Sequence, residues 1–186
     1  MPNMSTVSYS PAIMCILFFL AFFSASSVHV NGEEGIEFIK KTCNQTLDYS
    51  FCLTTLQADN RSSHANLTGL DVIAMEMGVK NATSTLSYIS KLLKQKTDPY
   101  TKACLKDCNE LYSSSIDSFK SGIENLGAKR YDDVNVDISA AMTNVDTCET
   151  GFTDGNGGAS PLTKQNQNLM NIGSLTLAIL KLIAEP

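Results

Sequence analysis

Apolar side chains recur in four stretches of the chain at alternating spacings of three and four residues. The stretches span residues 72–93, 105–126, 131–148 and 169–183. This spacing places the apolar side chains along one side of an α-helix, and such helices pack in bundles at crossing angles of about 20°. No stretch shows the alternation that is typical of a β-strand. The pattern therefore predicts an all-α protein with a four-helix bundle over residues 68–185.

The residues at the ends of these stretches agree with helix boundaries. Thr68 and Asp71 have the spacing of a capping box, which predicts the start of the first bundle helix. Asp98-Pro99 and Ser160-Pro161 each place a capping residue before a proline, which predicts the starts of the second and fourth helices. Gly127 follows the second stretch and predicts its end. Short connections imply antiparallel neighbours, so we expect an up-down-up-down bundle.

A shorter helical pattern precedes the bundle. Residues 33–60 hold two short pieces with apolar side chains, placed around Cys43 and Cys52. Helices this short are not stable alone, so their apolar sides must pack against another part of the protein. A disulfide between Cys43 and Cys52 would fix the turn of this α-hairpin. We expect the hairpin and the bundle to form a single domain over residues 33–186.

The N-terminal segment predicts export from the cell. Residues 12–23 form a continuous apolar run, which is shorter than the roughly 20 residues that span a bilayer. Small residues follow it, so residues 1–27 are predicted to be a secretory signal peptide, with cleavage between residues 27 and 32. We expect a secreted, extracellular protein, with no membrane association after removal of the signal. After the predicted signal peptide, four Asn-x-Ser/Thr triplets are candidates for N-glycosylation, at Asn44, Asn60, Asn66 and Asn81.

Five cysteines remain after removal of the signal peptide, and an exported protein can hold disulfides. In an antiparallel pair of helices, residues at equal distances from the turn face each other. Cys108 and Cys148 each lie 20 residues from Ala128 in the turn between the second and third bundle helices, so a Cys108–Cys148 disulfide is expected. Cys104 is then predicted to be a free thiol. A bridge from Cys104 to Cys148 is the alternative.

Composition and charge exclude several classes of function. The chain has 19 acidic and 14 basic residues, and its net charge of −5 argues against nucleic-acid binding. It has two histidines, His29 and His64, and no second close pair of cysteines, so no metal site is expected. The motifs of α/β-hydrolases, P-loop proteins and zinc proteases are absent, and no cofactor is expected. We therefore expect a binding module without catalytic activity.

Three segments carry a resemblance to a known family. They are Thr42-Cys43 through Tyr49-Ser-Phe-Cys52, Leu105-Lys-Asp-Cys108-Asn-Glu-Leu-Tyr112, and Tyr131-Asp-Asp-Val-Asn135 leading to Asp146-Thr-Cys148-Glu149. Over residues 35–184 the chain resembles the plant invertase and pectin methylesterase inhibitors, in particular the pollen-type invertase inhibitors. The resemblance implies an α-hairpin on a four-helix bundle, with disulfides Cys43–Cys52 and Cys108–Cys148. It also implies a non-catalytic protein that binds a cell-wall or vacuolar enzyme and blocks its substrate cleft.

The resemblance does not fix the target enzyme, because a fold does not determine a function. Invertase inhibitors of the family carry Pro-Lys-Phe in the turn before the third bundle helix, and the matching positions are Lys129, Arg130 and Tyr131. Because the proline is absent, the resemblance favours pectin methylesterase slightly over acid invertase, with a 1:1 complex expected. Two other interpretations are a carrier of an apolar ligand between the helices, and a pollen or storage protein without an enzyme target.

Overall fold

The computed structural model describes residues 32–154 and 158–185 of the 186-residue chain. These residues all belong to one compact unit. The predicted signal peptide, residues 1–27, and the following residues 28–31 lie outside the described residues.

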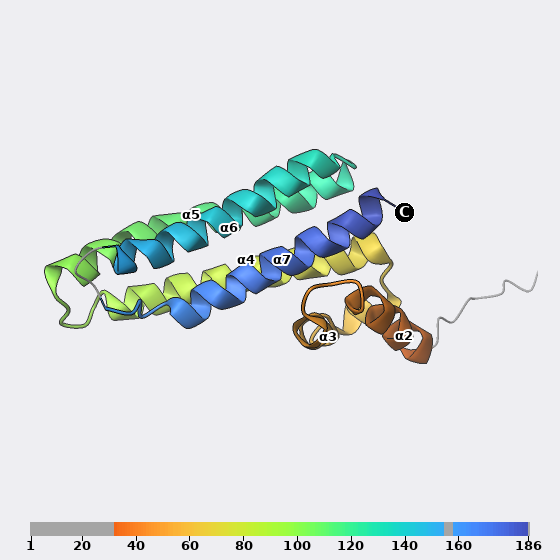
Figure 1. Ribbon diagram of the computed structural model, residues 1–186, viewed down its shortest axis with the longest axis horizontal. Coiled ribbons are helices and arrows are strands. Elements are labelled where there is room, and N and C mark those ends of the chain that lie inside the picture. Colours follow the sequence, from red (N-terminus) through yellow and green to blue (C-terminus); the bar gives the residue numbers. More distant parts are fainter. Residues whose placement is uncertain (1–31, 155–157, 186) are drawn as a thin grey trace, which may run out of the picture. The chain divides into compact units, whose positions relative to one another are not determined.

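Four long helices form an antiparallel bundle (Figure 1). They are α4 (Leu67–Leu92), α5 (Pro99–Gly127), α6 (Tyr131–Thr153) and α7 (Thr163–Ala184). Each helix contacts the next one along the chain, and α7 closes the bundle against α4. In Figure 1, α5 and α6 lie side by side in one layer, and α4 and α7 lie side by side in the other. The predicted all-α bundle with up-down-up-down topology is confirmed.

A helical hairpin precedes the bundle and packs against it. It consists of α2 (Gly32–Cys43) and α3 (Tyr49–Gln57), followed by the 3₁₀ helix η1 (Asn60–His64). Buried apolar side chains from the hairpin, α4 and α7 form one cluster, which includes Ile39, Leu56, Leu70, Ile73 and Ile179. An ion pair between Arg61 of η1 and Glu76 also joins the segment after the hairpin to α4. The bundle thus supplies the burial that the short helices need.

The bundle core combines aromatic side chains with a polar network. Phe119 of α5 is fully buried against Gly78 of α4, where an added Cβ would lie 2.6 Å from the ring. Tyr112 donates a hydrogen bond of 2.7 Å to Asn166 of α7, whose amide donates to Glu149 of α6. Burial raises the pKa of the Tyr112 hydroxyl, which keeps this donor protonated. Because an unpaired buried polar group is costly, the network favours one register of α5, α6 and α7.

The predicted start of α5 is correct, and that of α7 is wrong by two residues. Asp98 caps α5 by accepting a hydrogen bond of 2.9 Å from the backbone N–H of Thr101. Ser160 instead accepts a bond of 3.1 Å from the N–H of Leu162, in a turn that precedes the helix. Leu162 is fully buried, and α7 begins only after this anchor, at Thr163.

The capping box predicted for α4 is wrong. Asn66 is the capping residue, and its side chain accepts a hydrogen bond of 2.9 Å from the N–H of Gly69. The helix therefore begins at Leu67, before Thr68. Asp71 faces inward, is fully buried, and both of its carboxylate oxygens lack a hydrogen-bond partner among the described residues. The box does not form because Thr68 lies inside the helix and Asp71 is buried.

The structure contains both of the disulfides that were expected. Cys43 is joined to Cys52, with a Cα–Cα distance of 5.5 Å, and Cys108 is joined to Cys148, with 4.9 Å. Cys104 is a buried free thiol, and its Sγ donates a hydrogen bond of 3.2 Å to the carbonyl of Gly151. Cys148 is thus paired with Cys108 and not with Cys104.

Helix α7 is more apolar than we expected. By length and composition alone it could cross a membrane, although we expected no membrane association after removal of the signal peptide. Its apolar side chains serve two cores instead. Leu169, Ile172 and Leu180 belong to the bundle core, whereas Leu175 and Ile179 belong to the cluster beneath the hairpin. Packing on two sides explains the apolar composition of this helix.

Candidate functional site

The predicted target-binding turn joins α5 to α6 at one end of the bundle. The N–H of Lys129 bonds to the carbonyl of Leu126 at 3.0 Å, and the N–H of Arg130 bonds to that of Asn125 at 2.9 Å. These two bonds form a Schellman motif, in which one residue adopts the left-handed conformation. That residue is Lys129, with a φ of 58°, whereas Gly127 is the last residue of the helix and keeps a negative φ. The predicted end of α5 is correct, but its left-handed residue is not a glycine.

Arg130 is held in place by neighbouring side chains. Its Nε donates to the Asn125 Oδ1 at 3.0 Å and pairs with the Asp133 carboxylate at 3.2 Å. The amide of Asn125 in turn donates a hydrogen bond of 2.7 Å to Asp137 of α6. The guanidinium group is therefore tied to both helices that the turn connects, and part of its charge is balanced locally.

The other two residues of the turn differ in accessibility. Tyr131 is the first residue of α6, is half-buried, and packs against the bundle core. Lys129 is exposed, and its ammonium group has no partner among residues 32–154 and 158–185. Of the three positions predicted for target binding, only Lys129 is free to reach a partner without breaking an existing contact.

The outward side of α6 is a second candidate surface, which sequence reasoning missed. It exposes a row of small side chains at Val136, Ala140, Thr143 and Thr147. Val136 is 67% exposed, and the carboxylates of Asp132 and Asp133 lie beside the row at the start of the helix. Small side chains lose little entropy on binding and allow a partner to approach the helix closely. The available signal was a 4,3,4 spacing of small residues opposite the apolar side of the helix.

Residues 37–179 match the family described as plant invertase/pectin methylesterase inhibitor. The chain belongs to this family. It is 35% identical over 153 residues to "Putative invertase inhibitor" of Platanus orientalis, an alignment that covers 79% of this chain and 90% of that protein. It is 30% identical over 143 residues to "Pectinesterase inhibitor" of Actinidia deliciosa, which covers 77% of each chain.

Solved structures of the family share the fold. The crystal structure of mutant form A of a pectin methylesterase inhibitor from Arabidopsis superimposes with a TM-score of 0.66 at 25% identity. The match covers 77% of this chain and 95% of that one. The resemblance inferred from the sequence segments is thus confirmed. Proteins of this family are enzyme inhibitors and not enzymes, and the relatives carry the names of both target enzymes.

The four glycosylation triplets of this family member lie in different surroundings. Asn44, Asn60 and Asn66 are exposed, and Asn66 also caps α4. Asn81 lies in the middle of α4 and is half-buried. Glycosylation of all four asparagines stays a prediction, and Asn81 has the least room for a glycan.

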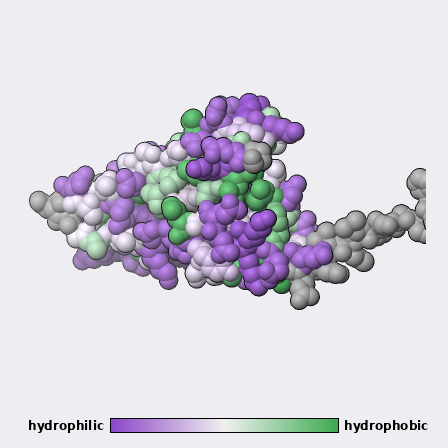
Figure 2. All heavy atoms as spheres, turned by 45° about the vertical axis from the view of Figure 1, so that its right-hand side comes forward, coloured by the Kyte–Doolittle hydropathy of each residue, from purple (hydrophilic) through white to green (hydrophobic). Residues whose placement is uncertain are grey.

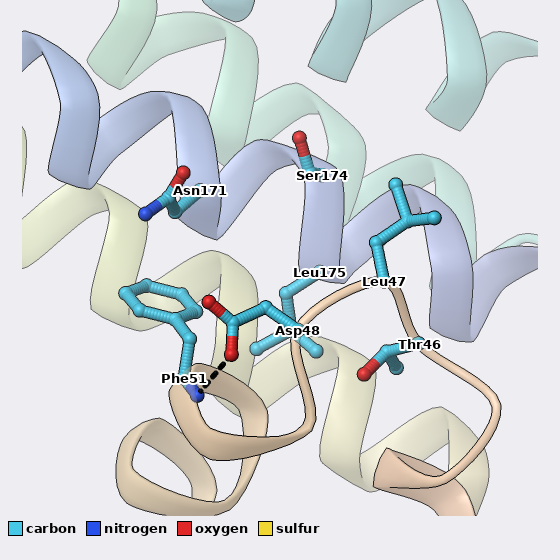
Figure 3. Close-up of a pocket in the computed structure, with 7 residues that line it drawn as sticks. All are labelled: Thr46, Leu47, Asp48, Phe51, Asn171, Ser174 and Leu175. Carbon is cyan, nitrogen blue, oxygen red and sulfur yellow. Dashed lines mark hydrogen bonds between the residues drawn. The ribbon is translucent and has the colours of Figure 1, made fainter.

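A small pocket lies between the hairpin turn and α7 (Figure 3). Asp48 caps α3 by accepting a hydrogen bond of 2.9 Å from the N–H of Phe51, and the ring of Phe51 lies beside Asn171 of α7. Leu47, at the edge of the pocket, is 97% exposed. In the view of Figure 2, hydrophilic side chains surround apolar ones that gather in the middle of the face.

The fully buried Tyr112 and Phe119 within the bundle argue against the carrier interpretation, because they occupy the space between the helices.

Proposed function

We propose that this protein is a secreted, non-catalytic inhibitor of pectin methylesterase that occludes the substrate cleft of the enzyme in a 1:1 complex. The observation that carries the choice of target is the state of the turn between α5 and α6. Invertase inhibitors with Pro-Lys-Phe insert that tripeptide into the invertase cleft. Here the aromatic residue, Tyr131, packs against the core, and the guanidinium of Arg130 is tied to Asn125 and Asp133.

The family resemblance implies that inhibitors of pectin methylesterase cover the enzyme's cleft with the sides of their helices, so inhibition of that enzyme would not depend on this turn. The outward side of α6 supports such a contact, because the small, exposed side chains of Val136, Ala140 and Thr143 allow a partner to approach the helix closely. Two disulfides and a packed core keep this surface rigid before binding. Preorganisation of this kind reduces the entropy lost in the complex.

Acid invertase is the second candidate target. Relatives with names that refer to invertase support it, and Lys129 and Tyr131 retain a cation and an aromatic residue at the positions of Pro-Lys-Phe. Insertion into an invertase cleft would require Tyr131 to leave its contacts with the bundle core.

The test is a parallel titration of both enzymes. Residues 33–186 are produced in an oxidising host, the two disulfides are verified by mass, and inhibition constants are measured at about pH 5. We expect inhibition of pectin methylesterase and little effect on acid invertase. Inhibition of the invertase alone would overturn the choice of target, and inhibition of neither enzyme by a correctly bridged protein would overturn the proposed function.

A pair of double variants tests the role of the turn. Lys129→Ala with Arg130→Ala removes its two charges, and Lys91→Ala with Lys94→Ala removes two exposed charges at the C-terminal end of α4. For a target bound by helix sides, both double variants should change the inhibition constant by less than about threefold. A selective loss of inhibition in the turn variant would show that the turn is the inhibitory element.

Inhibition should also depend on pH in the acidic range of the plant cell wall. Carboxylates on both partners can change their charge in this range, and Asp132 and Asp133 border the proposed contact surface. We expect different inhibition constants at about pH 5 and about pH 7. Equal constants at the two pH values would refute an electrostatic contribution to binding.

Secretion is part of the same proposal. It is supported by the apolar run at residues 12–23 and by the two disulfides, which persist in oxidising compartments. Expression of the full chain in plant cells, followed by mass analysis of the apoplastic fluid, tests it. Retention of the intact chain inside the cells would contradict it.

A further inference from the structure

A groove with both polar and apolar walls runs over three helices on the side of the molecule where the hairpin meets the bundle. It is formed by α3, α4 and α7, and two adjoining hollows of 370 and 770 Å³ share Phe51, Asn81 and Asn168 in their walls. We call it the α4–α7 groove. Figure 3 shows the pocket that adjoins it, and the two share Phe51 of α3 and Asn171 of α7 in their walls.

The walls of the α4–α7 groove are rich in amide side chains. The amides belong to Asn81, Gln165, Gln167, Asn168 and Asn171. Gln167 and Asn171 bond to each other at 2.8 Å, whereas the side chains of Gln165 and Asn168 have no partner among the described residues. The Oδ1 of Asn81 is buried and unpaired in the part of the chain that the structure describes. The unpaired amides of Gln165 and Asn168 leave donors and acceptors free for a ligand in the groove, whereas the Oδ1 of Asn81 would reach one only after its side chain turns.

Amides and an aromatic ring together suit a sugar. Each amide offers both a donor and an acceptor, which matches the hydroxyl groups of a saccharide. The half-buried ring of Phe51 offers an apolar surface on which the C–H face of a sugar ring can pack. The groove is also long rather than closed, since it extends from α3 to the first turn of α7 at Thr163. An extended chain of sugars fits this shape better than a single small molecule does.

The charge of the α4–α7 groove selects for an acidic sugar. Lys80 and Lys164 are exposed residues of its walls, and none of its wall residues is acidic, although the chain as a whole has a net charge of −5. Asp59 acts electrostatically on Lys80, but its carboxylate is paired with Arg61 at 2.6 Å. The surface that favours an acidic sugar ends at the adjoining pocket, which is lined by the acidic residue Asp48.

We infer that the α4–α7 groove binds an oligosaccharide of uronic acids. The two lysines pair with carboxylates of the sugar chain, the amides bond to its hydroxyls, and Phe51 packs against one ring. The inference is independent of the choice between the two target enzymes, because it concerns a site formed by the inhibitor alone.

The test uses unglycosylated residues 33–186 from an oxidising bacterial host, because a glycan on Asn81 would fill the groove. Binding of unesterified galacturonic-acid oligomers is measured by calorimetry, with neutral galactose oligomers of equal length as the comparison. We expect saturable binding of the acidic oligomers only, and weaker binding as the salt concentration rises. Equal binding of the neutral oligomers, or no binding of either, would overturn the inference.

Two variants separate the groove from the rest of the surface. Lys80→Ala with Lys164→Ala should weaken binding about tenfold, whereas the matched control on α5, Lys102→Ala with Lys106→Ala, should change it less than about twofold. Equal losses in the two double variants would show that only the overall charge matters. Asn81→Asp keeps the shape of the side chain but adds a negative charge, so it should abolish binding. Unchanged binding by a variant with an intact circular dichroism spectrum would contradict the assignment of the site.

Discussion

The two disulfides offer a direct test of how covalent links stabilise this fold. Two variants replace one pair each by alanine, Cys108→Ala with Cys148→Ala and Cys43→Ala with Cys52→Ala, both in a Cys104→Ser background that prevents thiol exchange. All four bridged cysteines are at most 1% exposed, so the two double variants lose similar amounts of buried sulfur. The difference in stability between the two double variants therefore reports mainly on how each disulfide restricts the unfolded chain.

The expected magnitudes follow from the length of chain that each disulfide closes. The sequence separations are 40 residues for Cys108–Cys148 and 9 residues for Cys43–Cys52. In the chain-entropy treatment these loops correspond to about 3.9 and about 2.6 kcal/mol at 25 °C. Loss of the Cys108–Cys148 bridge should thus cost about 1.3 kcal/mol more than loss of the Cys43–Cys52 bridge.

The measurement is urea-induced unfolding at neutral pH, followed by far-ultraviolet circular dichroism and extrapolated to water. The parent protein is the Cys104→Ser variant with both disulfides intact. If loss of the Cys43–Cys52 bridge costs as much as loss of Cys108–Cys148, or more, the argument from loop closure is refuted. The hairpin bridge would then act mainly through the native packing of α2 and α3 on α4 and α7.

Three further predictions concern single side chains. Gly78→Ala should destabilise the protein by about 1–3 kcal/mol, because its Cβ would lie 2.6 Å from the ring of Phe119. Gly173→Ala should cost less, because the side chain nearest to its Cβ is the flexible Met142. Equal urea midpoints of the two variants would contradict this. Burial raises the pKa of Asp71, so the unfolded chain loses a proton at about pH 4 that the folded chain keeps. The contribution of Asp71 to stability should therefore be greatest below about pH 4 and fall as the pH rises toward the folded pKa. Asp71→Asn should remove this contribution, so the difference in stability between the two proteins should change between about pH 4 and about pH 7, which unfolding curves at both pH values would test. Lys129→Gly should raise stability by about 1 kcal/mol, because glycine adopts a positive φ without strain, and a lower melting temperature would contradict that reasoning.

Sequence reasoning succeeded where a physical requirement repeats along the chain. A helix that buries one side must place apolar residues every three or four positions, so the four bundle helices could be recognised without any tertiary information. The antiparallel order of α5 and α6 then placed Cys108 opposite Cys148. The start of α5 was also predictable, because Asp98 bonds to a backbone group only three residues away.

It failed where one pattern has two meanings that only burial distinguishes. Thr68 and Asp71 have the spacing of a capping box, but Asp71 faces the interior and Asn66 takes the cap. Ser160-Pro161 has the composition of a helix start, but α7 begins only after the buried Leu162.

By itself, the sequence therefore determined the helices and their antiparallel order, and it favoured both disulfide pairs, because each depends on local spacing or on simple register. The structure decided between Cys108 and Cys104 as the partner of Cys148. Only the tertiary structure decided which side chains are free to bind. It placed Tyr131 against the core, tied Arg130 to Asn125, and brought Asn81 of α4 next to Asn168 of α7. Such contacts join residues that are distant in the chain, and they depend on how whole helices pack.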